Sequence, residues 1–156
     1  MIKNIILNGI KSHKYDLIIY PAEFFELRTQ EEIVRSDEYD SSFVYVEMDF
    51  EKIRKTLQNE TEEIAFWEAA LRSMAIKKRG SDVLGFSQDD AGIGLLLLDS
   101  KMEGWIRLQG RISEFCRLTI GNVSATLAKG TKAFVYPSCL KDIQPKATTT
   151  KEACGF

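Results

Sequence analysis

Carboxylates at two places along the chain are the side chains best suited to metal-assisted chemistry. Glu47 stands near the end of an expected strand, and Asp89 and Asp90 stand in an expected turn. Carboxylate oxygens bind Mg²⁺, and handling a triphosphate requires such ions together with compensating cations. Glu47 with Asp89 or Asp90 could hold one ion. The alternative is a strand end and a turn that are simply polar.

Histidine and cysteine are too sparse for several other kinds of site. His13 is the only histidine, which excludes histidine-rich metal sites and most histidine-based catalysis. Cys116, Cys139 and Cys154 are an odd number of cysteines without Cys-x-x-Cys spacing. A zinc site or a disulfide framework needs a more regular pattern. We therefore expect reduced thiols, as in a cytosolic protein.

The composition is typical of one globular domain. The chain has 156 residues, of which 44% are hydrophobic and 28% charged, and its formal net charge is -2. No broad positive field can attract nucleic acid or anionic lipid. No apolar run approaches the ~20 residues that span a bilayer, and the start does not look like a signal peptide. We expect a cytoplasmic protein with no nucleic-acid partner and no membrane insertion.

The spacing of the apolar residues predicts the elements that position these side chains. Residues 36–42 are polar and predict a turn, and 1–14 are compatible with a strand, a helix or a connection. Helices are predicted at 21–35, from 50 or 61 to 78, and at 101–115, and strands at 42–49, 82–86, 93–98, 117–128 and 133–136. This order predicts an α/β (α+β) fold, with a central mixed or antiparallel sheet flanked by helices.

Read together, these elements resemble the GGDEF family, whose active members condense two GTP molecules into cyclic di-GMP. Residues 47–56, Glu-Met-Asp-Phe-Glu-Lys-Ile-Arg-Lys-Thr, are similar to the family's Asp-x-Asp-x-Phe-Lys-x-x-Asn-Asp stretch. Residues 79–82 form Arg-x-x-Asp upstream of a hairpin, and either 87–91 or 88–92 stand in place of Gly-Gly-Asp/Glu-Glu-Phe. The family's Ser-Ile-Gly-Val-Ala strand is matched to 118–127. The resemblance implies a nucleotidyl-cyclase-like fold with a ferredoxin-like core.

The resemblance also implies domain limits and a loss of activity. It gives an N-terminal extension at 1–15, a degenerate GGDEF-like domain at 16–143 and a flexible tail at 144–156. Lys55 replaces the family's guanine-binding asparagine, and a later guanine-binding aspartate falls near Ile64, which cannot accept a hydrogen bond. The glycine pair of the signature is missing, so side chains stand where bare backbone should approach phosphates. We expect no catalytic residues, no cofactor and only vestigial metal binding at the three carboxylates.

The Arg-x-x-Asp stretch is the sharpest functional hypothesis. In the family this motif binds cyclic di-GMP: the arginine contacts a phosphate or a guanine edge, and the aspartate accepts from guanine N–H groups. Arg79 and Asp82 match it, and Arg111 could add positive charge. The plain alternative is a helix end that carries basic residues, with Asp82 pairing locally.

Several functions therefore remain open. The first is an inactive regulatory or scaffold domain in bacterial signalling that binds cyclic di-GMP. The second is a protein-interaction or dimerisation module with no nucleotide ligand, and the third is a residual diguanylate cyclase. Trp67 and Trp105 could anchor a partner, although their helical spacing predicts core positions. A generic ferredoxin-like domain that binds RNA would need a basic face, which the acidic balance opposes.

Overall fold

The computed structural model describes residues 2–12, 14–76 and 82–138. Its centre is a five-stranded sheet in the order β1-β3-β4-β2-β5. The strands are β1 (Ile19–Tyr20), β2 (Phe43–Asp49), β3 (Val83–Phe86), β4 (Gly92–Leu98) and β5 (Thr131–Tyr136). β1 pairs parallel with β3, and the other three pairs are antiparallel. The expected mixed sheet is thereby confirmed.

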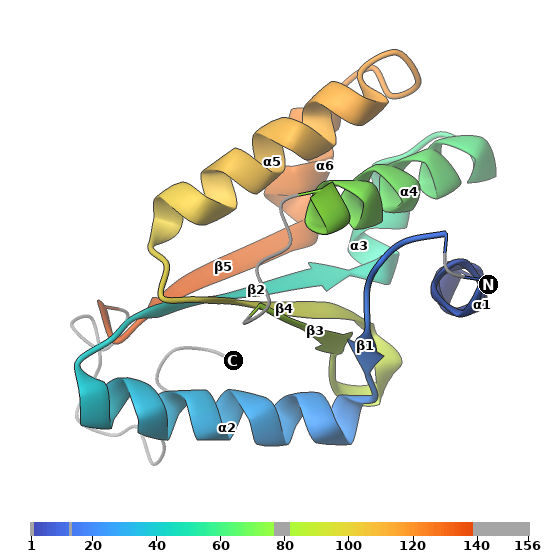
Figure 1. The fold of residues 1–156 in the computed structure, drawn as a ribbon. Helices are drawn as coiled ribbons and strands as arrows, with labels where there is room; N and C mark the ends of the chain where they lie inside the picture. The colour runs from blue at the N-terminus through green and yellow to red at the C-terminus, as the bar shows by residue number, and fades with distance from the viewer. Residues whose placement is uncertain (1, 13, 77–81, 139–156) are drawn as a thin grey trace.

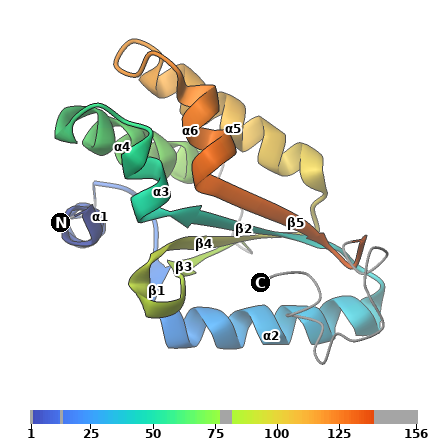
Figure 2. The same ribbon diagram turned by 180° about the vertical axis from the view of Figure 1, so that it is seen from behind.

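Helices cover the two faces of the sheet unequally. The helices are α1 (Ile2–Lys11), α2 (Ala22–Tyr39), α3 (Phe50–Lys55), α4 (Glu60–Ile76), α5 (Met102–Cys116) and α6 (Val123–Gly130). α2 lies alone on one face, while α3 to α6 lie on the other and α1 lies beside α4 (Figures 1 and 2). None of the helices among the described residues is long and apolar enough to cross a membrane.

Alternation along β2 divides the core between these faces. Val44, Val46 and Met48 belong to the large cluster formed with α4, α5 and α6, whereas Phe43 and Tyr45 belong to the smaller cluster under α2. Successive side chains of a strand point to opposite faces, so one strand serves both clusters. Residues of the large cluster include Ile6, Trp67 and Trp105, which are 1%, 1% and 4% exposed. The tryptophans therefore occupy the predicted core positions, and α1 packs into the same core.

α2 sits close to the sheet because two glycines face it. Gly85 on β3 and Gly94 on β4 are opposite each other in the sheet, and the Phe25 ring lies over both. A Cβ added to Gly85 would lie 2.5 Å from the Phe25 ring, and one added to Gly94 would overlap the other side of that ring. Phe25 is 3% exposed. The pair of glycines thus forms a slot for one aromatic ring.

Two local predictions are wrong, each for a local reason. Residues 118–127 do not form a strand: α6 begins at Val123, and the Asn122 side chain caps it by accepting a hydrogen bond from Ala125 N–H (3.1 Å). β5 takes the sheet position beside β2 instead. α2 continues through 36–39, because Ser36 faces the core. Of the two starts expected for the next helix, 61 is close to the start of α4, and 50 is the start of the separate helix α3. Asn59 caps α4 by accepting a hydrogen bond from Glu62 N–H (2.9 Å).

Candidate functional site

The β3–β4 hairpin has two ends that carry the side chains singled out by the sequence. Its turn end is residues 87–91, where a 3-10 turn spans Gln88–Asp90 and Ser87 N–H bonds to the Gly92 carbonyl (3.0 Å). Its open end is Asp82, Leu98 and Asp99. The two ends lie at opposite ends of the hairpin (Figure 1), and the cavities beside them share no lining residue, so they form two separate candidate sites.

At the turn end, Asp90 is held by α1. Lys3 Nζ lies 2.6 Å from Asp90 Oδ2 and 5.1 Å from the centre of the Phe86 ring. A cavity of about 610 Å³ opens beside this pair and is lined by residues of α1, α3, α4 and the turn, among them Asn4, Phe50, Arg54, Glu63 and Asp90. Asp89 is exposed and has a left-handed backbone conformation with φ 58°.

Glu47 lies apart from this cavity. It lines a small hollow with Asp49 and three lysines, Lys52, Lys129 and Lys132. Asp49 caps α3 by accepting from Lys52 N–H (2.9 Å). Burial raises the pKa of the neighbouring Tyr45, and Glu47 raises it further. Within the described residues, no three His, Cys, Asp or Glu side chains are arranged to hold a metal ion. Asp49 lines both this hollow and the cavity beside Asp90, so metal binding at Glu47, Asp89 and Asp90 stays a prediction.

Gly92 is the glycine on which the turn end depends. It pairs with Asp49 across β4 and β2, and a Cβ at this position would overlap the carbonyl oxygen of Met48. The start of β4 therefore packs directly against the backbone of β2. This contact concerns strand packing, whereas the glycine pair of the GGDEF signature concerns approach to phosphate.

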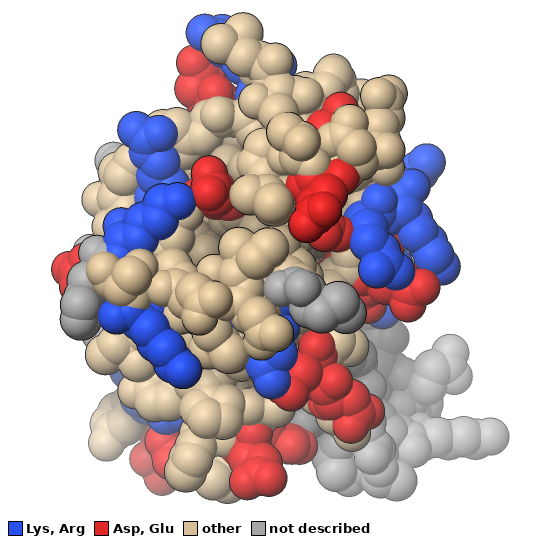
Figure 3. Space-filling view, turned by 90° about the vertical axis from the view of Figure 1, so that its right-hand side faces the viewer, with Lys and Arg blue, Asp and Glu red and all other residues tan. Residues whose placement is uncertain are grey.

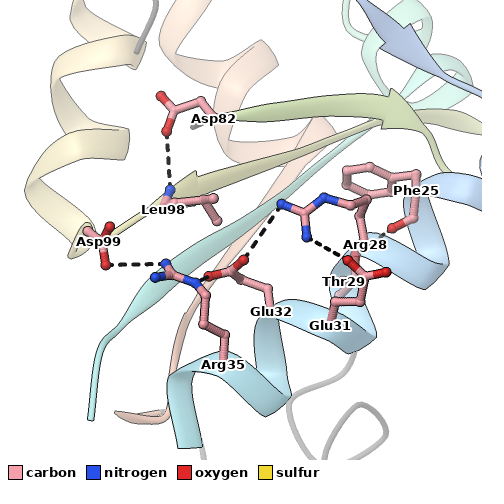
Figure 4. Close-up of polar contacts among 9 residues, drawn as sticks. All are labelled: Phe25, Arg28, Thr29, Glu31, Glu32, Arg35, Asp82, Leu98 and Asp99. Carbon is pink, nitrogen blue, oxygen red and sulfur yellow. Dashed lines mark hydrogen bonds and ion pairs between the residues drawn. The ribbon is translucent and has the colours of Figure 1, made fainter. Parts of the chain in front are cut away.

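At the open end, Asp82 precedes β3 and reaches across to β4. Its Oδ1 accepts a hydrogen bond from Leu98 N–H (3.2 Å), as Figure 4 shows. Arg79, the other half of the motif, lies outside the described residues. A cavity of about 490 Å³ adjoins Asp82, with walls formed mainly by leucines of β3, β4 and α5 and by one charged group on α2.

That charged group is a chain of ion pairs that sequence reasoning missed. Glu32 is 1% exposed and lies between two arginines, with Arg35 Nε at 2.5 Å and Arg28 at 3.7 Å. Arg35 continues the chain to Asp99 (3.3 Å) (Figure 4). The hydrogen bond that Arg35 donates to Glu32 raises the pKa of Arg35. A glutamate on the inner side of α2 with arginines at i−4 and i+3 is the sequence signal that could have revealed it.

Arg111 occupies the neighbouring cavity, of about 450 Å³, together with Lys101, Glu103 and Arg107 of the first turns of α5. Its Nε is buried, and no acceptor from the described part of the chain reaches it. Burial lowers the pKa of Arg111, and the like charge of Arg107 lowers it further. Leu97 and Asp99 line both this cavity and the one beside Asp82. The structure therefore places Asp82 and Arg111 in adjoining cavities.

No protein-family model matches the sequence, and no curated protein matches it. Solved structures do. The GGDEF domain of YfiN (TpbB) from Pseudomonas aeruginosa superposes with a TM-score of 0.51 at 14% identity, covering 77% of this chain and 78% of that one. An N-terminally truncated form of the same protein that comprises only the GGDEF domain gives 0.49 at 16% identity, with 77% of this chain and 73% of that one covered.

A third similar structure is the coiled coil and GGDEF domain of DgcB from Caulobacter crescentus, solved in complex with c-di-GMP. It has a TM-score of 0.47 at 9% identity, and the match covers 85% of this chain and 73% of that one. At such identities a likeness concerns the fold alone. The mixed five-stranded sheet, its flanking helices and the match to the YfiN domain together show that this chain has the fold of a GGDEF domain, the fold of diguanylate cyclases.

Proposed function

We propose that this domain is a catalytically inactive regulatory module of bacterial signalling that binds cyclic di-GMP at the open end of the β3–β4 hairpin. Arg111 and Asp82 make the central contacts, and Arg79 contributes from the Arg-x-x-Asp motif. The observation that supports this proposal is the environment of the Arg111 guanidinium. Its buried Nε has no acceptor among the described residues, and a second guanidinium lies close by.

The chemistry of the dinucleotide complements this arrangement. A phosphate oxygen gives Arg111 the acceptor that it lacks and offsets the repulsion from Arg107, since guanidinium and phosphate form strong charge-assisted hydrogen bonds. A guanine edge offers N–H donors to the carboxylate of Asp82. The leucine-lined cavity beside Asp82 can accept an apolar base face. Both parts of the ligand thus find a complementary group in adjoining cavities.

Inactivity is supported by the contacts of the turn end. Asp90 is paired with Lys3, Asp49 caps α3, and Glu47 lines a different hollow from Asp90. Cyclase chemistry requires carboxylates that converge on metal ions. Here the same residue types make structural contacts, so the domain is better suited to sense the dinucleotide than to synthesise it.

Calorimetric titration with cyclic di-GMP, with GTP plus Mg²⁺ in a parallel run, tests this function. We expect saturable binding of the dinucleotide alone. Arg111→Ala should weaken it roughly 10- to 150-fold, because a hydrogen bond to a charged group contributes about 1.5–3 kcal/mol. Arg117→Ala is the matched control, since that side chain is 66% exposed on the far end of α5. Equal affinity of the Arg111 variant and the parent would contradict the proposal.

Asp82 requires a variant that keeps its structural bond. Asp82→Asn retains an oxygen for Leu98 N–H but removes the charge that favours guanine N–H donors, so it should weaken binding without unfolding the hairpin. Arg79→Ala tests the other half of the motif. Turnover of GTP would overturn the inactive assignment. If neither nucleotide binds, the remaining function is that of a protein-interaction or dimerisation module.

A further inference from the structure

The outward side of α2 carries an apolar stripe that none of the described elements covers. Phe24, Leu27 and Val34 are 58%, 58% and 56% exposed, and we call them the α2 stripe. Spacings of three and seven residues put them on one side of the helix. The opposite side holds the buried residues of α2, which are Phe25, Thr29, Glu32, Ile33 and Ser36. α2 therefore has two apolar sides, and the sheet covers only one.

The stripe lies in acidic surroundings. Exposed carboxylates of α2 and its C-cap surround it: Glu23, Glu26, Glu31, Asp37, Glu38 and Asp40. The two arginines of α2, Arg28 and Arg35, are engaged by Glu31, Glu32 and Asp99. Carboxylates and uncharged side chains meet along the lower edge of Figure 3, where α2 lies. The face thus combines apolar anchors with an excess of negative charge.

This combination selects the kind of partner. A second copy of the chain would bring acidic flanks against acidic flanks, and like charges across an interface are repulsive. A helix with apolar side chains flanked by lysine or arginine would satisfy both features, since helices dock on one another through apolar ridges. We propose that the α2 stripe docks a basic amphipathic helix of another protein.

The proposed docking surface is separate from the dinucleotide site. α2 lies on the opposite face of the sheet from α5, which carries Arg111 (Figure 2). α2 lines the Asp82 cavity only through Arg28, Glu32 and Arg35, and none of these belongs to the stripe. Substitutions in the stripe therefore leave the Arg111 cavity intact. Failure of one proposal can be distinguished from failure of the other, because each is tested with its own ligand.

Fluorescence anisotropy with a labelled model peptide tests the docking. The peptide has the length of α2, 18 residues, with leucines at helical spacing flanked by lysines; a second peptide carries glutamates instead. We expect the basic peptide to bind, more weakly as salt rises, and the acidic peptide not to bind. Leu27→Gln should weaken binding roughly tenfold or more, the loss expected for one apolar anchor.

The matched control is Ile106→Gln, because Ile106 is also 58% exposed but lies on α5. It should leave peptide affinity unchanged. Equal loss from Ile106→Gln, equal binding of the acidic peptide, or no binding of the basic one would each overturn the proposal. So would sedimentation as a dimer that Leu27→Gln abolishes, because that result would assign the stripe to a second copy.

Discussion

The turn end and the open end of the β3–β4 hairpin carry similar residue types but use them differently. At the turn end, Asp90 forms an ion pair with Lys3, and Gly92 packs directly against the backbone of β2. At the open end, the buried Nε of Arg111 has no acceptor among the described residues, and Arg107 lines the same cavity. The protein itself pairs the charge of Asp90 at one end, whereas we propose that a ligand pairs the charge of Arg111 at the other.

This difference separates catalysis from recognition within one fold. Catalysis needs several groups to converge on reacting atoms, and at the turn end these groups make contacts that stabilise the fold. Recognition needs only a complementary charge and a cavity, and our proposal assigns this role to the open end. On this proposal, a GGDEF fold keeps a binding surface without the geometry for phosphoryl transfer.

The turn end should be the more sensitive to substitution. Gly92→Ala forces a Cβ against the Met48 carbonyl oxygen, so β4 must move away from β2. We expect the free energy of unfolding to fall by about 3 kcal/mol, as for overpacking against backbone. Urea denaturation measures this change through the transition midpoint.

Gly110→Ala is the control for that substitution. Gly110 lies in α5, where an added Cβ meets nothing within 4 Å. Because alanine favours a helix more than glycine does, this variant should be more stable by about 0.5–1 kcal/mol. A Gly92 variant as stable as the parent would show that the turn end is loosely packed, and the contrast between the two ends would fail.

The reactivity of the Cys116 thiol tests whether α5, the helix that carries Arg111, stays closed in the folded protein. Cys116 is 1% exposed, and burial raises its pKa from 9.0 to about 11. At about pH 8 this lowers the thiolate fraction about 100-fold, so the thiol should react slowly with a disulfide reagent. Cys139→Ser with Cys154→Ser leaves Cys116 as the only thiol, and the unfolded chain in urea gives the reference rate.

The same shift makes stability depend on pH. The thiol ionises more easily in the unfolded chain, so its effect is absent below about pH 9 and stability falls as pH rises toward 11. Rapid reaction of the folded variant near pH 8 would mean that α5 opens readily. In that case the cavity around Arg111 would not be a preformed site.

The smallest effect should come from the ion pair at the turn end. Lys3 and Asp90 side chains are 38% and 43% exposed, and exposed pairs contribute less than about 1 kcal/mol. We expect Asp90→Asn to lower stability by no more than that, and less at high salt. Hydrogen exchange of the α1 amides should show faster opening of this helix. A loss of several kcal/mol would mean that Asp90 is more deeply involved in the fold.

The sequence predicted the parts of the fold whose apolar pattern is regular. β2, the β3–β4 hairpin and α5 lie close to their expected limits, because alternation or helical spacing continues along each. The run from 117 to 128 misled, since its apolar and β-branched residues favour a strand while α6 depends on the Asn122 cap. A helix cap is one hydrogen bond from one side chain. It barely changes the spacing of the apolar residues, so that spacing does not reveal it.

The candidate site was predictable only in its parts. Asp82 was singled out through a family motif and Arg111 as a nearby positive charge, and the structure places them in adjoining cavities. Glu32 was not, because a charged residue in a helical pattern reads as solvent-facing. Its burial depends on Arg28 and Arg35 of the same helix together with Asp99, 64 residues from Arg35. Contacts made across that separation cannot be read from spacing along one helix.

Because the ring of Phe25 lies over two facing glycines, the residues at positions 25, 85 and 94 constrain one another during evolution. A side chain at 85 or 94 would collide with the ring, and a small residue at 25 would leave a void over the sheet. None of the three can drift alone, although a paired change can restore the fit. We therefore expect very divergent relatives of this chain to keep a recognisable signature after their functional motifs have changed. It consists of an aromatic residue early in the first long helix and one glycine on each strand of the hairpin.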